Sequence, residues 1–321
     1  MYISNSFIAI LAATTTTQAF QFSTVTSGVG SRVSQTKRAL SSLVGNLLQP
    51  QKSEQKSCPA VWSEISTALT AQFLADGQCT DAARAAIRAA FHDCFNGACD
   101  GSLILANECS NSENRGLERL CGNLGNLASE KKVGVADLIQ FAGAHAIKTC
   151  PGGPTVPVKI GRKDSSDANT IGVLPTGREK SNDLIKLFAS KGFSVTDLVA
   201  LIGAHSVAKQ RTTDPSKAGA SLDSTPGQWD NKYYSETTQK KAPFTLESDR
   251  SLATNLVAAV PFNAFALSKS AWAAAFVGAM QKMSMLGVEG VELTDCTAAL
   301  PGGSNKRDVK SSPIGDRMAT K

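Results

Sequence analysis

The stretch that decides the fold is residues 81–95, DAARAAIRAAFHDCF. Alanine is the strongest helix former and an aspartate is favourable at a helix start, so this stretch predicts a helix. Residues 137–148 (DLIQFAGAHAIK) and 197–209 (DLVALIGAHSVAK) share the opening aspartate and the apolar, small-residue composition. Strand-like alternation is brief, as over 156–160. The sequence therefore predicts an all-α fold with minimal β structure.

Helix ends are also marked in the sequence. Ser194 and Asp197 have the spacing of a capping box at the start of the third helix. A glycine ends a predicted helix over 181–191, because glycine readily adopts the left-handed conformation that closes a helix. The Gly-Ala-His triplets at 143–145 and 203–205 indicate two buried helices that need small residues for close packing. A repeat array is not favoured, because no third copy occurs.

Composition limits the possible function classes. The chain has 321 residues, 42% hydrophobic and 19% charged, so it can bury a core. No run of Lys and Arg exceeds two residues at a net charge of +6, which argues against a nucleic-acid partner. The apolar run 7–13 is too short to span a bilayer, so no membrane partner is expected. Eight cysteines favour an oxidising compartment and therefore a secreted, extracellular protein.

Four segments are expected along the chain. A short apolar run followed by small residues predicts a signal peptide over 1–19. Residues 20–56 are rich in Ser, Thr and Gln and predict a propeptide, cut after Arg38, or a merely disordered lead. One folded domain is expected over 57–303. A polar, disordered tail is expected over 304–321.

Three histidines are present, so a histidine-based site must use His92, His145 or His205. Arg88 and His92 lie four residues apart and share one face of the predicted helix. A neighbouring cation depresses the pKa of an imidazole, which leaves a neutral base at neutral pH. On these residues alone, a surface arginine beside a partly buried histidine remains an open alternative.

Two loops carry the hard oxygen ligands that Ca²⁺ prefers. The first, 93–102, contains two aspartates and a serine around a pair of cysteines. The second consists of Ser206 and the later segment 223–230, which again contains two aspartates and hydroxyl side chains. A solvated turn is the alternative interpretation of each loop.

Taken in this order, the motifs resemble those of secreted haem peroxidases of the plant-peroxidase superfamily, above all the fungal class that includes lignin and manganese peroxidases. RAAFHDCF at 88–95 resembles the distal haem helix, and DLVALIGAHSV at 197–207 resembles the proximal helix. DSTPGQWDNKYY at 223–234 is similar to the loop that follows, and LESD at 246–249 to the segment with the proximal aspartate. The resemblance spans 58–301 and implies a helical haem fold with two calcium sites.

The resemblance implies haem b as cofactor and hydrogen peroxide as the oxidising substrate. His205 would bind the haem iron, and Asp249 would accept the other ring proton of that histidine. His92 would take a proton from one oxygen of hydrogen peroxide and return it to the other. Arg88 would stabilise the charge that develops on the departing oxygen, and Asn114 would hold His92 in its basic tautomer.

The resemblance also implies two structural Ca²⁺ ions and four disulfides. Ala98 and Gln228 would contribute backbone carbonyls to the calcium sites. The expected ligands are Asp93, Ala98, Asp100 and Ser102 on the distal side, and Ser206, Asp223, Thr225, Gln228 and Asp230 on the proximal side. The expected disulfides are Cys58–Cys296 and Cys79–Cys150, as in fungal members, Cys94–Cys99, as in plant members, and the remaining pair Cys109–Cys121.

Two features of the specialised fungal enzymes are missing. The positions that bind Mn²⁺ in manganese peroxidases hold Asp81, Ala85 and Arg211, and one acid beside one cation makes a poor Mn²⁺ site. The position of the surface radical tryptophan of lignin and versatile peroxidases holds Ala200. Phe91 would close the distal pocket, so that donors react at the haem edge.

We therefore expect a monomeric haem peroxidase that oxidises small phenolic and aromatic donors in one-electron steps. One alternative is a manganese or lignin-type peroxidase, and another is a non-catalytic, calcium-stabilised secreted binding protein on the same scaffold. His145 is expected to be structural, because no aspartate-rich loop follows it. Trp229, Tyr233 and Tyr234 are expected to pack beneath the proximal calcium loop, although such side chains can carry a radical.

Overall fold

A computed structural model describes residues 57–302 of the chain. The expected signal peptide (1–19), lead segment (20–56) and tail (304–321) lie outside the described residues, as does the last residue of the expected domain. Within 57–302, no single helix is long and apolar enough to cross a membrane. The segments Ser181–Ser190 and Val195–Val207 pass the length and composition criteria only as a pair bent by 109°.

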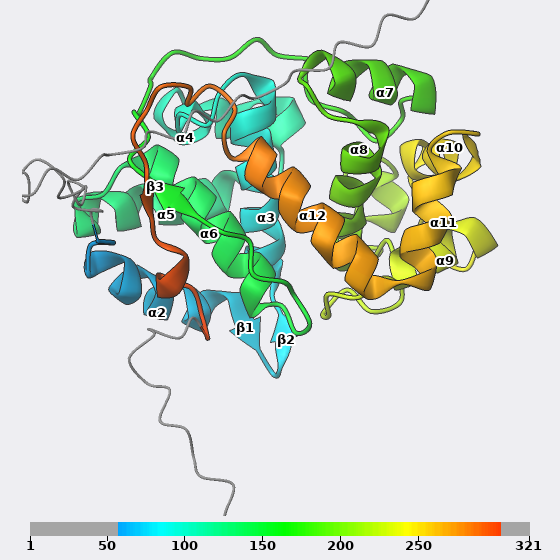
Figure 1. Cartoon of the computed structure of the whole chain (residues 1–321), viewed down its shortest axis with the longest axis horizontal. Coiled ribbons are helices and arrows are strands. Elements are labelled where there is room, and N and C mark those ends of the chain that lie inside the picture. Colours follow the sequence, from blue (N-terminus) through cyan, green and yellow to red (C-terminus); the bar gives the residue numbers. More distant parts are fainter. Residues whose placement is uncertain (1–56, 303–321) are drawn as a thin grey trace, which may run out of the picture. The chain divides into compact units, whose positions relative to one another are not determined.

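The fold consists of two groups of helices joined by a long helix, α12 (Figure 1). The first group surrounds α6 and comprises α2 (Val61–Phe73), α3 (Asp81–Asn96), α4 (Ser102–Leu105), α5 (Glu118–Lys131) and α6 (Val135–Thr149). The second comprises α7 (Ser181–Ser190), α8 (Val195–Ile202), α9 (Lys232–Gln239), α10 (Glu247–Thr254) and α11 (Ala259–Leu267). Helix α12 (Lys269–Met283) packs against α8 and also against α3, so it holds the two groups together.

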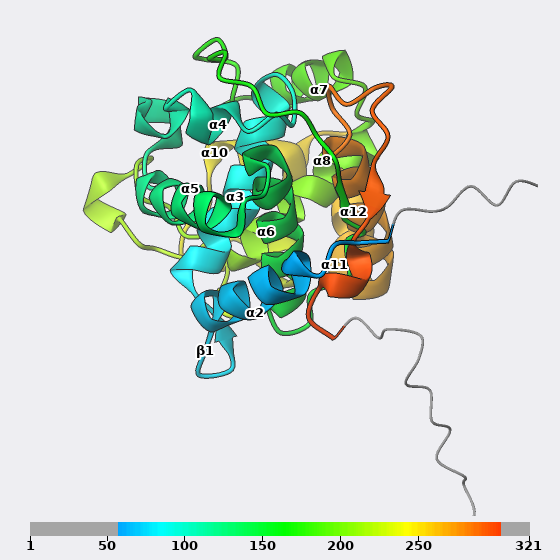
Figure 2. The same ribbon diagram turned by 90° about the vertical axis from the view of Figure 1, so that its left-hand side faces the viewer.

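Helix α6 is the centre of the first group. Almost all of its residues are buried, as expected of a helix that is apolar on every side. Figure 2 shows α3, α5 and α6 side by side, with α2 below them. In the part of the chain that the structure describes, the strands form two antiparallel pairs, β1 (Leu74–Ala75) with β2 (Gln78–Cys79), and β3 (Lys159–Ile160) with β4 (Thr294–Asp295). The predicted all-α class with minimal β structure is confirmed.

Small residues allow both histidine-bearing segments to pack closely. A Cβ added to Gly143 of α6 would lie 2.5 Å from the Cβ of Ala90 on α3. A Cβ added to Gly203 would lie 2.3 Å from the hydroxyl of Tyr234 and 2.4 Å from the indole nitrogen of Trp272. Both distances are far inside van der Waals contact. The prediction that these glycines serve close packing is therefore confirmed.

The second of these helices is shorter than predicted. The expected capping box of Ser194 and Asp197 is present at the start of α8, but α8 ends at Ile202 and a 3-10 turn, η3 (Gly203–Val207), follows. Tyr234 and Trp272 donate hydrogen bonds to the carbonyls of Val199 and Ala200, at 2.8 and 3.0 Å. These carbonyls would otherwise accept the next α-helical bonds. The helix therefore tightens into the 3-10 turn that carries His205.

Four disulfides are present, and each joins the expected pair. One ties the start of the folded body to its end, a separation of 238 residues, and another closes the loop that follows α3. The pairs are Cys58–Cys296, Cys79–Cys150, Cys94–Cys99 and Cys109–Cys121. Such a set is typical of proteins that fold in an oxidising compartment.

Candidate active site

Helix α3 brings the first two candidate catalytic residues together. One turn separates Arg88 from His92, and the Arg88 Nε donates a hydrogen bond to the His92 Nε2 at 3.0 Å. The two other guanidinium nitrogens donate to the backbone carbonyls of Arg115 at 2.9 Å and Glu113 at 2.7 Å. Carbonyls rather than a carboxylate orient the guanidinium, and within residues 57–302 Arg88 forms no ion pair that would neutralise its charge.

Asn114 fixes the tautomer of His92. The His92 Nδ1 lies 2.6 Å from the Asn114 Oδ1, and the Asn114 Nδ2 donates to the backbone carbonyl of Glu108 at 2.9 Å. That carbonyl can only accept, so the amide oxygen must face the histidine and accept the Nδ1 proton. The lone pair of His92 therefore sits on Nε2, beside Arg88. This atom is the proton acceptor of the cluster.

The surroundings of His92 keep it neutral. Burial, followed by the positive charge of Arg88, lowers the pKa of His92 to about 3, and the hydrogen bond to Asn114 opposes this shift. Burial also lowers the pKa of Arg88. The pair therefore combines a neutral base and a partly buried cation at neutral pH, which can accept a proton and stabilise a developing negative charge.

Phe91 forms an aromatic wall next to this pair. Its ring stacks on Phe95 with centroids 4.8 Å apart and meets His92 edge-on at 5.7 Å. Phe188 from α7 packs against both phenylalanines, at 6.3 and 4.5 Å. Phe91 is partly exposed, whereas Phe95 and Phe188 are buried. The apolar rings of this wall restrict the space beside His92.

The third candidate histidine has a carboxylate behind it. The His205 Nδ1 lies 3.1 and 3.2 Å from the two oxygens of Asp249, which is fully buried on α10. The carboxylate accepts the Nδ1 proton, so the lone pair is on Nε2, which has no partner among residues 57–302. The side chain of His205 is 30% exposed, although Gly203, Ser206 and Val207 around it are buried. An imidazole with an unpartnered Nε2 and a carboxylate on Nδ1 is the donor set that binds haem iron, so the residues fit haem.

His145 is separate from both clusters. It is fully buried in α6 and hydrogen bonds to the carbonyl of Ser66, to the hydroxyl of Thr70 and to Thr149, at 2.8, 3.1 and 3.2 Å. Burial lowers its pKa to about 4. With both ring nitrogens occupied, His145 has no atom free for a ligand. The interpretation of this residue as structural is supported by these contacts.

The distal calcium candidates lie in the loop after α3. Both oxygens of the fully buried Asp93 accept backbone bonds, from Gly101 at 3.2 Å and Leu103 at 3.3 Å, and burial raises the Asp93 pKa to about 8. Asp100 accepts from the backbone of Ser102 at 3.1 Å. Ala98 lies in the loop closed by the Cys94–Cys99 disulfide and packs against Gly287. A Cβ added to Gly287 would lie 2.3 Å from the Cβ of Ala98.

The proximal calcium candidates converge beneath η3. Ser206 donates to Asp223 at 3.1 Å, Thr225 donates to Asp230 at 2.8 Å, and the backbone of Thr225 donates to Asp223 at 2.8 Å. Gln228 belongs to the same turn, since its N–H donates to the Thr225 carbonyl at 2.9 Å. Burial raises the pKa of Asp223 to about 7. A buried carboxylate with a raised pKa is one that a cation would stabilise.

The two candidate calcium loops do not rely on charged side chains alone. Within the part of the chain that the structure describes, no three His, Cys, Asp or Glu side chains form a group able to hold a metal ion. Each loop instead offers two aspartates together with hydroxyl and carbonyl oxygens, which is a set suited to Ca²⁺.

Comparison with known proteins identifies the family. A model of the Peroxidase family matches residues 61–267. A low-redox potential peroxidase of Taiwanofungus camphoratus is 33% identical over 283 residues, which cover 78% of this chain and 84% of that protein. The chain belongs to the peroxidase family. A peroxidase of Arthromyces ramosus is 27% identical, over 83% of this chain and 82% of the relative, and manganese peroxidase 3 of Phlebia radiata is 26% identical, over 75% and 79%.

This peroxidase is a haem enzyme that oxidises reducing substrates with hydrogen peroxide. The predicted family, fold class and enzyme class are therefore confirmed. The expected site residues form two clusters, one around His92 on α3 and one around His205 on η3.

The position that corresponds to the manganese site is dominated by cations in this peroxidase. Asp81 forms ion pairs with Arg84 at 2.9 Å, Arg211 at 3.1 Å and Lys209 at 3.4 Å. Ala85 adds no charge. Sequence reasoning found Asp81 and Arg211 but missed two cations. Arg84 lies three residues after Asp81 on α3, and Lys209 follows η3 and reaches Asp81 from a distant part of the chain.

Other supporting groups were also missed from the sequence. The carbonyls of Glu113 and Arg115 orient Arg88, and a carbonyl carries no sequence signal. Glu108 is buried. One of its carboxylate oxygens accepts a hydrogen bond from the backbone N–H of Asn169 at 2.7 Å. The other carboxylate oxygen has no hydrogen-bond partner among residues 57–302. Asn169 in turn donates to Ser102 at 2.8 Å, which links the distal calcium loop to the segment that holds Asn114.

Proposed function

We propose that this peroxidase is a generic, low-potential enzyme that uses haem b and hydrogen peroxide to oxidise small phenolic and aromatic donors in one-electron steps. The observation that carries the proposal is the Arg88–His92–Asn114 network, in which a neutral histidine has its basic nitrogen beside a cation. A non-catalytic binding protein would have no need for a partly buried arginine that is held against a neutral histidine by backbone carbonyls.

In this proposal His92 is the acid–base group. Its Nε2 takes a proton from one oxygen of hydrogen peroxide and delivers it to the other oxygen, which leaves as water. Arg88 stabilises the negative charge that builds on the departing oxygen while the proton is in transit. Asn114 keeps the Nδ1 proton in place, so that His92 begins each cycle with its lone pair on Nε2, beside Arg88.

His205 and Asp249 are proposed to hold the cofactor. The free Nε2 of His205 would bind the iron, and Asp249 would make the imidazole a stronger donor by accepting its Nδ1 proton. Haem, when bound, supplies the iron at which the O–O bond of peroxide is broken and through which donors are oxidised. Phe91 is proposed to exclude donors from the space beside His92.

Two Ca²⁺ ions are proposed, one in each aspartate-containing loop. The distal ligands are Asp93, Ala98, Asp100 and Ser102, and the proximal ligands are Ser206, Asp223, Thr225, Gln228 and Asp230. Each ion would tether a histidine-bearing segment to its following loop. The raised pKa values of Asp93 and Asp223 support this role, because among residues 57–302 neither carboxylate forms an ion pair with a cation.

The specialised alternatives are less well supported. At the position of the manganese site, three cations surround Asp81, which opposes binding of Mn²⁺. Ala200 is buried and offers no surface radical site. Trp229, Tyr233 and Tyr234 are also fully buried, so donors cannot reach them directly. The name of the Taiwanofungus camphoratus relative agrees with a low redox potential.

The remaining features of the proposal concern the whole chain. Residues 1–19 would be a signal peptide, 20–56 a propeptide or lead, 57–303 the catalytic domain and 304–321 a tail. Four disulfides support secretion to an extracellular location. A monomer is proposed, because a single chain supplies both histidine clusters.

Absorption spectra and a donor panel test the proposal. The haem-loaded protein should show a Soret band that changes on addition of one equivalent of peroxide and returns when a phenol is added. Turnover should follow phenolic donors and be absent with Mn²⁺ or a non-phenolic aromatic ether. Efficient turnover of Mn²⁺ would replace the generic function by the manganese-specific one, and a missing Soret band with ample haem would favour the binding protein.

A further inference from the structure

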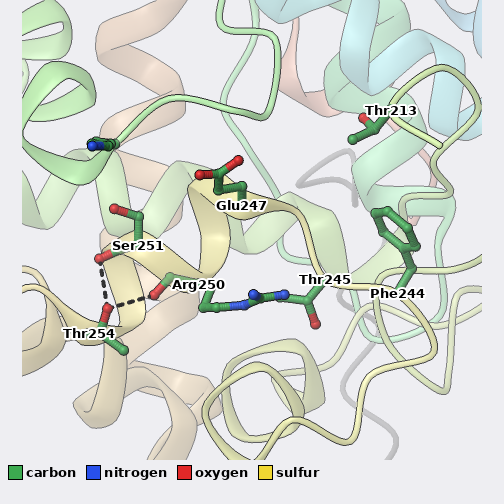
Figure 3. A pocket seen from close by; sticks show the side chains of 8 residues that line it. Thr213, Phe244, Thr245, Glu247, Arg250, Ser251 and Thr254 are labelled. Carbon is green, nitrogen blue, oxygen red and sulfur yellow. Dashed lines mark hydrogen bonds between the residues drawn. The ribbon is translucent and has the colours of Figure 1, made fainter.

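A surface hollow lies on the outer side of the helix that carries Asp249. Its volume is about 520 Å³, and three distant segments line it: the start of α7, the loop after η3, and the segment that runs into α10. Figure 3 shows side chains from these segments. The lining residues are Lys180, Thr213, Phe244, Thr245, Glu247, Arg250, Ser251 and Thr254. A hollow of this size accommodates a small organic molecule.

Helix α10 separates the hollow from the proposed haem ligand. Glu247, Arg250 and Thr254 recur at the three- and four-residue spacing of one helix face, and all three are exposed. Asp249 and Leu252, on the opposite face, are fully buried, and Asp249 contacts His205. A molecule in the hollow would therefore lie one helix diameter, about 10 Å, from the proximal histidine cluster.

The hollow carries uncompensated positive charge. Arg250 and Lys180 line it, and within residues 57–302 neither has a carboxylate within ion-pairing distance. Lys217 does not line the hollow, but its Nζ lies 6.0 Å from the ring centroid of Phe244. Glu247 is the one acidic lining residue. A carboxylate is the ligand group that the guanidinium of Arg250 recognises best, because two parallel hydrogen bonds can form.

The lining also suits an aromatic ring. Phe244 forms a half-exposed wall of the hollow, as Figure 3 shows opposite α10, and offers a face for stacking. The hydroxyls of Thr213 and Thr245 have no protein partner among residues 57–302, so they are free to bond to a ligand. We propose that this hollow binds an aromatic monocarboxylate, in particular a phenolic acid, as a reducing donor: the phenol gives one electron to the peroxide-oxidised enzyme and its hydroxyl proton to solvent, and leaves as a phenoxyl radical. This inference rests on the proposed function and adds the chemical class of the donor and its place of binding.

Arg250 and Glu247 carry opposite charges, so replacing each of them should change the affinity for an anion in opposite directions. Arg250→Gln removes the group that binds the carboxylate, so affinity for the anion should fall. Glu247→Gln removes the one repulsive charge, so affinity for the same anion should rise. Arg119→Gln is the matched control, because Arg119 is exposed on α5, which packs against α3, α4 and α6. None of these residues belongs to the proposed haem or peroxide machinery.

Two probes separate charge recognition from general reactivity. 4-Hydroxycinnamate carries the carboxylate, and 4-hydroxycinnamyl alcohol has the same ring and phenol without it. Binding of each to the resting holoenzyme, measured by equilibrium dialysis without peroxide, should show the Kd for the anion raised about three- to fivefold by Arg250→Gln. The Kd for the alcohol should not change, and Glu247→Gln should lower that for the anion. Steady-state KM values with peroxide should move in the same directions at constant kcat.

Several results would overturn the inference. An anion Kd that is the same in Arg250→Gln and Arg119→Gln would show that the hollow does not hold the carboxylate. Equal changes for the anion and the alcohol would indicate a structural effect. Failure of the proposed function is a separate result: the wild-type holoenzyme would then oxidise neither probe, whereas the dialysis measurement would still report on the hollow.

Discussion

The pH dependence of the reaction with peroxide follows directly from the surroundings of His92. Burial and the charge of Arg88 lower the pKa of His92 to about 3. The base is therefore available until the pH falls through that value, rather than through the ordinary 6.5. At pH 4, a pKa of 3 leaves about 90% of His92 neutral, whereas a pKa of 6.5 would leave about 0.3%. The two cases differ about 300-fold in the concentration of active base.

The assay is the second-order rate constant for the change in haem absorbance on mixing the holoenzyme with peroxide. A pH-jump stopped-flow measurement from neutral buffer avoids prolonged exposure to acid, and the spectrum of the unmixed enzyme at each pH reports haem retention. The rate constant should stay within about twofold between pH 7 and pH 4. An inflection near pH 6.5 with haem retained would refute the assignment of His92 as a buried base beside Arg88.

Two variants test the causes of the shift with opposite signs. Arg88→Leu removes a cation that disfavours protonation, so the inflection should move up from about 3; it should stay below 6.5, because burial is the larger cause. Asn114→Leu removes a hydrogen bond that favours protonation, so the inflection should move down. His145→Gln is the control and should leave the profile unchanged, because His145 hydrogen bonds elsewhere.

Further predictions concern stability, calcium and specificity. Gly143→Ala would place a methyl group 2.5 Å from the Cβ of Ala90 and should destabilise the protein by about 1–3 kcal/mol. Gly278→Ala, where an added Cβ on α12 meets open space, should stabilise it by about 0.5–1 kcal/mol. Thermal unfolding measures both changes in the free energy of unfolding. Prolonged calcium chelation should loosen the haem pocket and reduce Soret absorbance; an unchanged spectrum would argue against structural calcium. The wild type should not oxidise Mn²⁺, and Ala85→Glu combined with Arg211→Asp should introduce that activity; steady-state rates with Mn²⁺ would show whether the cations are the obstacle.

Much of the fold could be predicted from the sequence, because the helix-forming and capping residues of several helices lie within those helices. Alanine-rich runs with an opening aspartate mark α3, and the capping box marks the start of α8. The end of α8 could not be predicted. It depends on Tyr234 and Trp272, which reach back from later helices to the last helical carbonyls. A local pattern carries no information about such long-range hydrogen bonds.

The candidate site was predictable only in part for the same reason. The four-residue spacing placed Arg88 and His92 on one helix face, and their contact follows from helix geometry. The orientation of the guanidinium depends on two carbonyls that lie 25 and 27 residues further along the chain. The cations around Asp81 and the hollow beside α10 likewise bring together segments that are far apart in sequence.

The assignment of His92 as the acid–base group is tested most directly by one rate constant. The second-order rate constant for peroxide should fall by about 10²- to 10⁴-fold in His92→Leu, with the Soret spectrum of the resting enzyme retained. The same measurement in His145→Gln should match the wild type. A His92→Leu variant that binds haem and reacts with peroxide within tenfold of the wild type would contradict the mechanism.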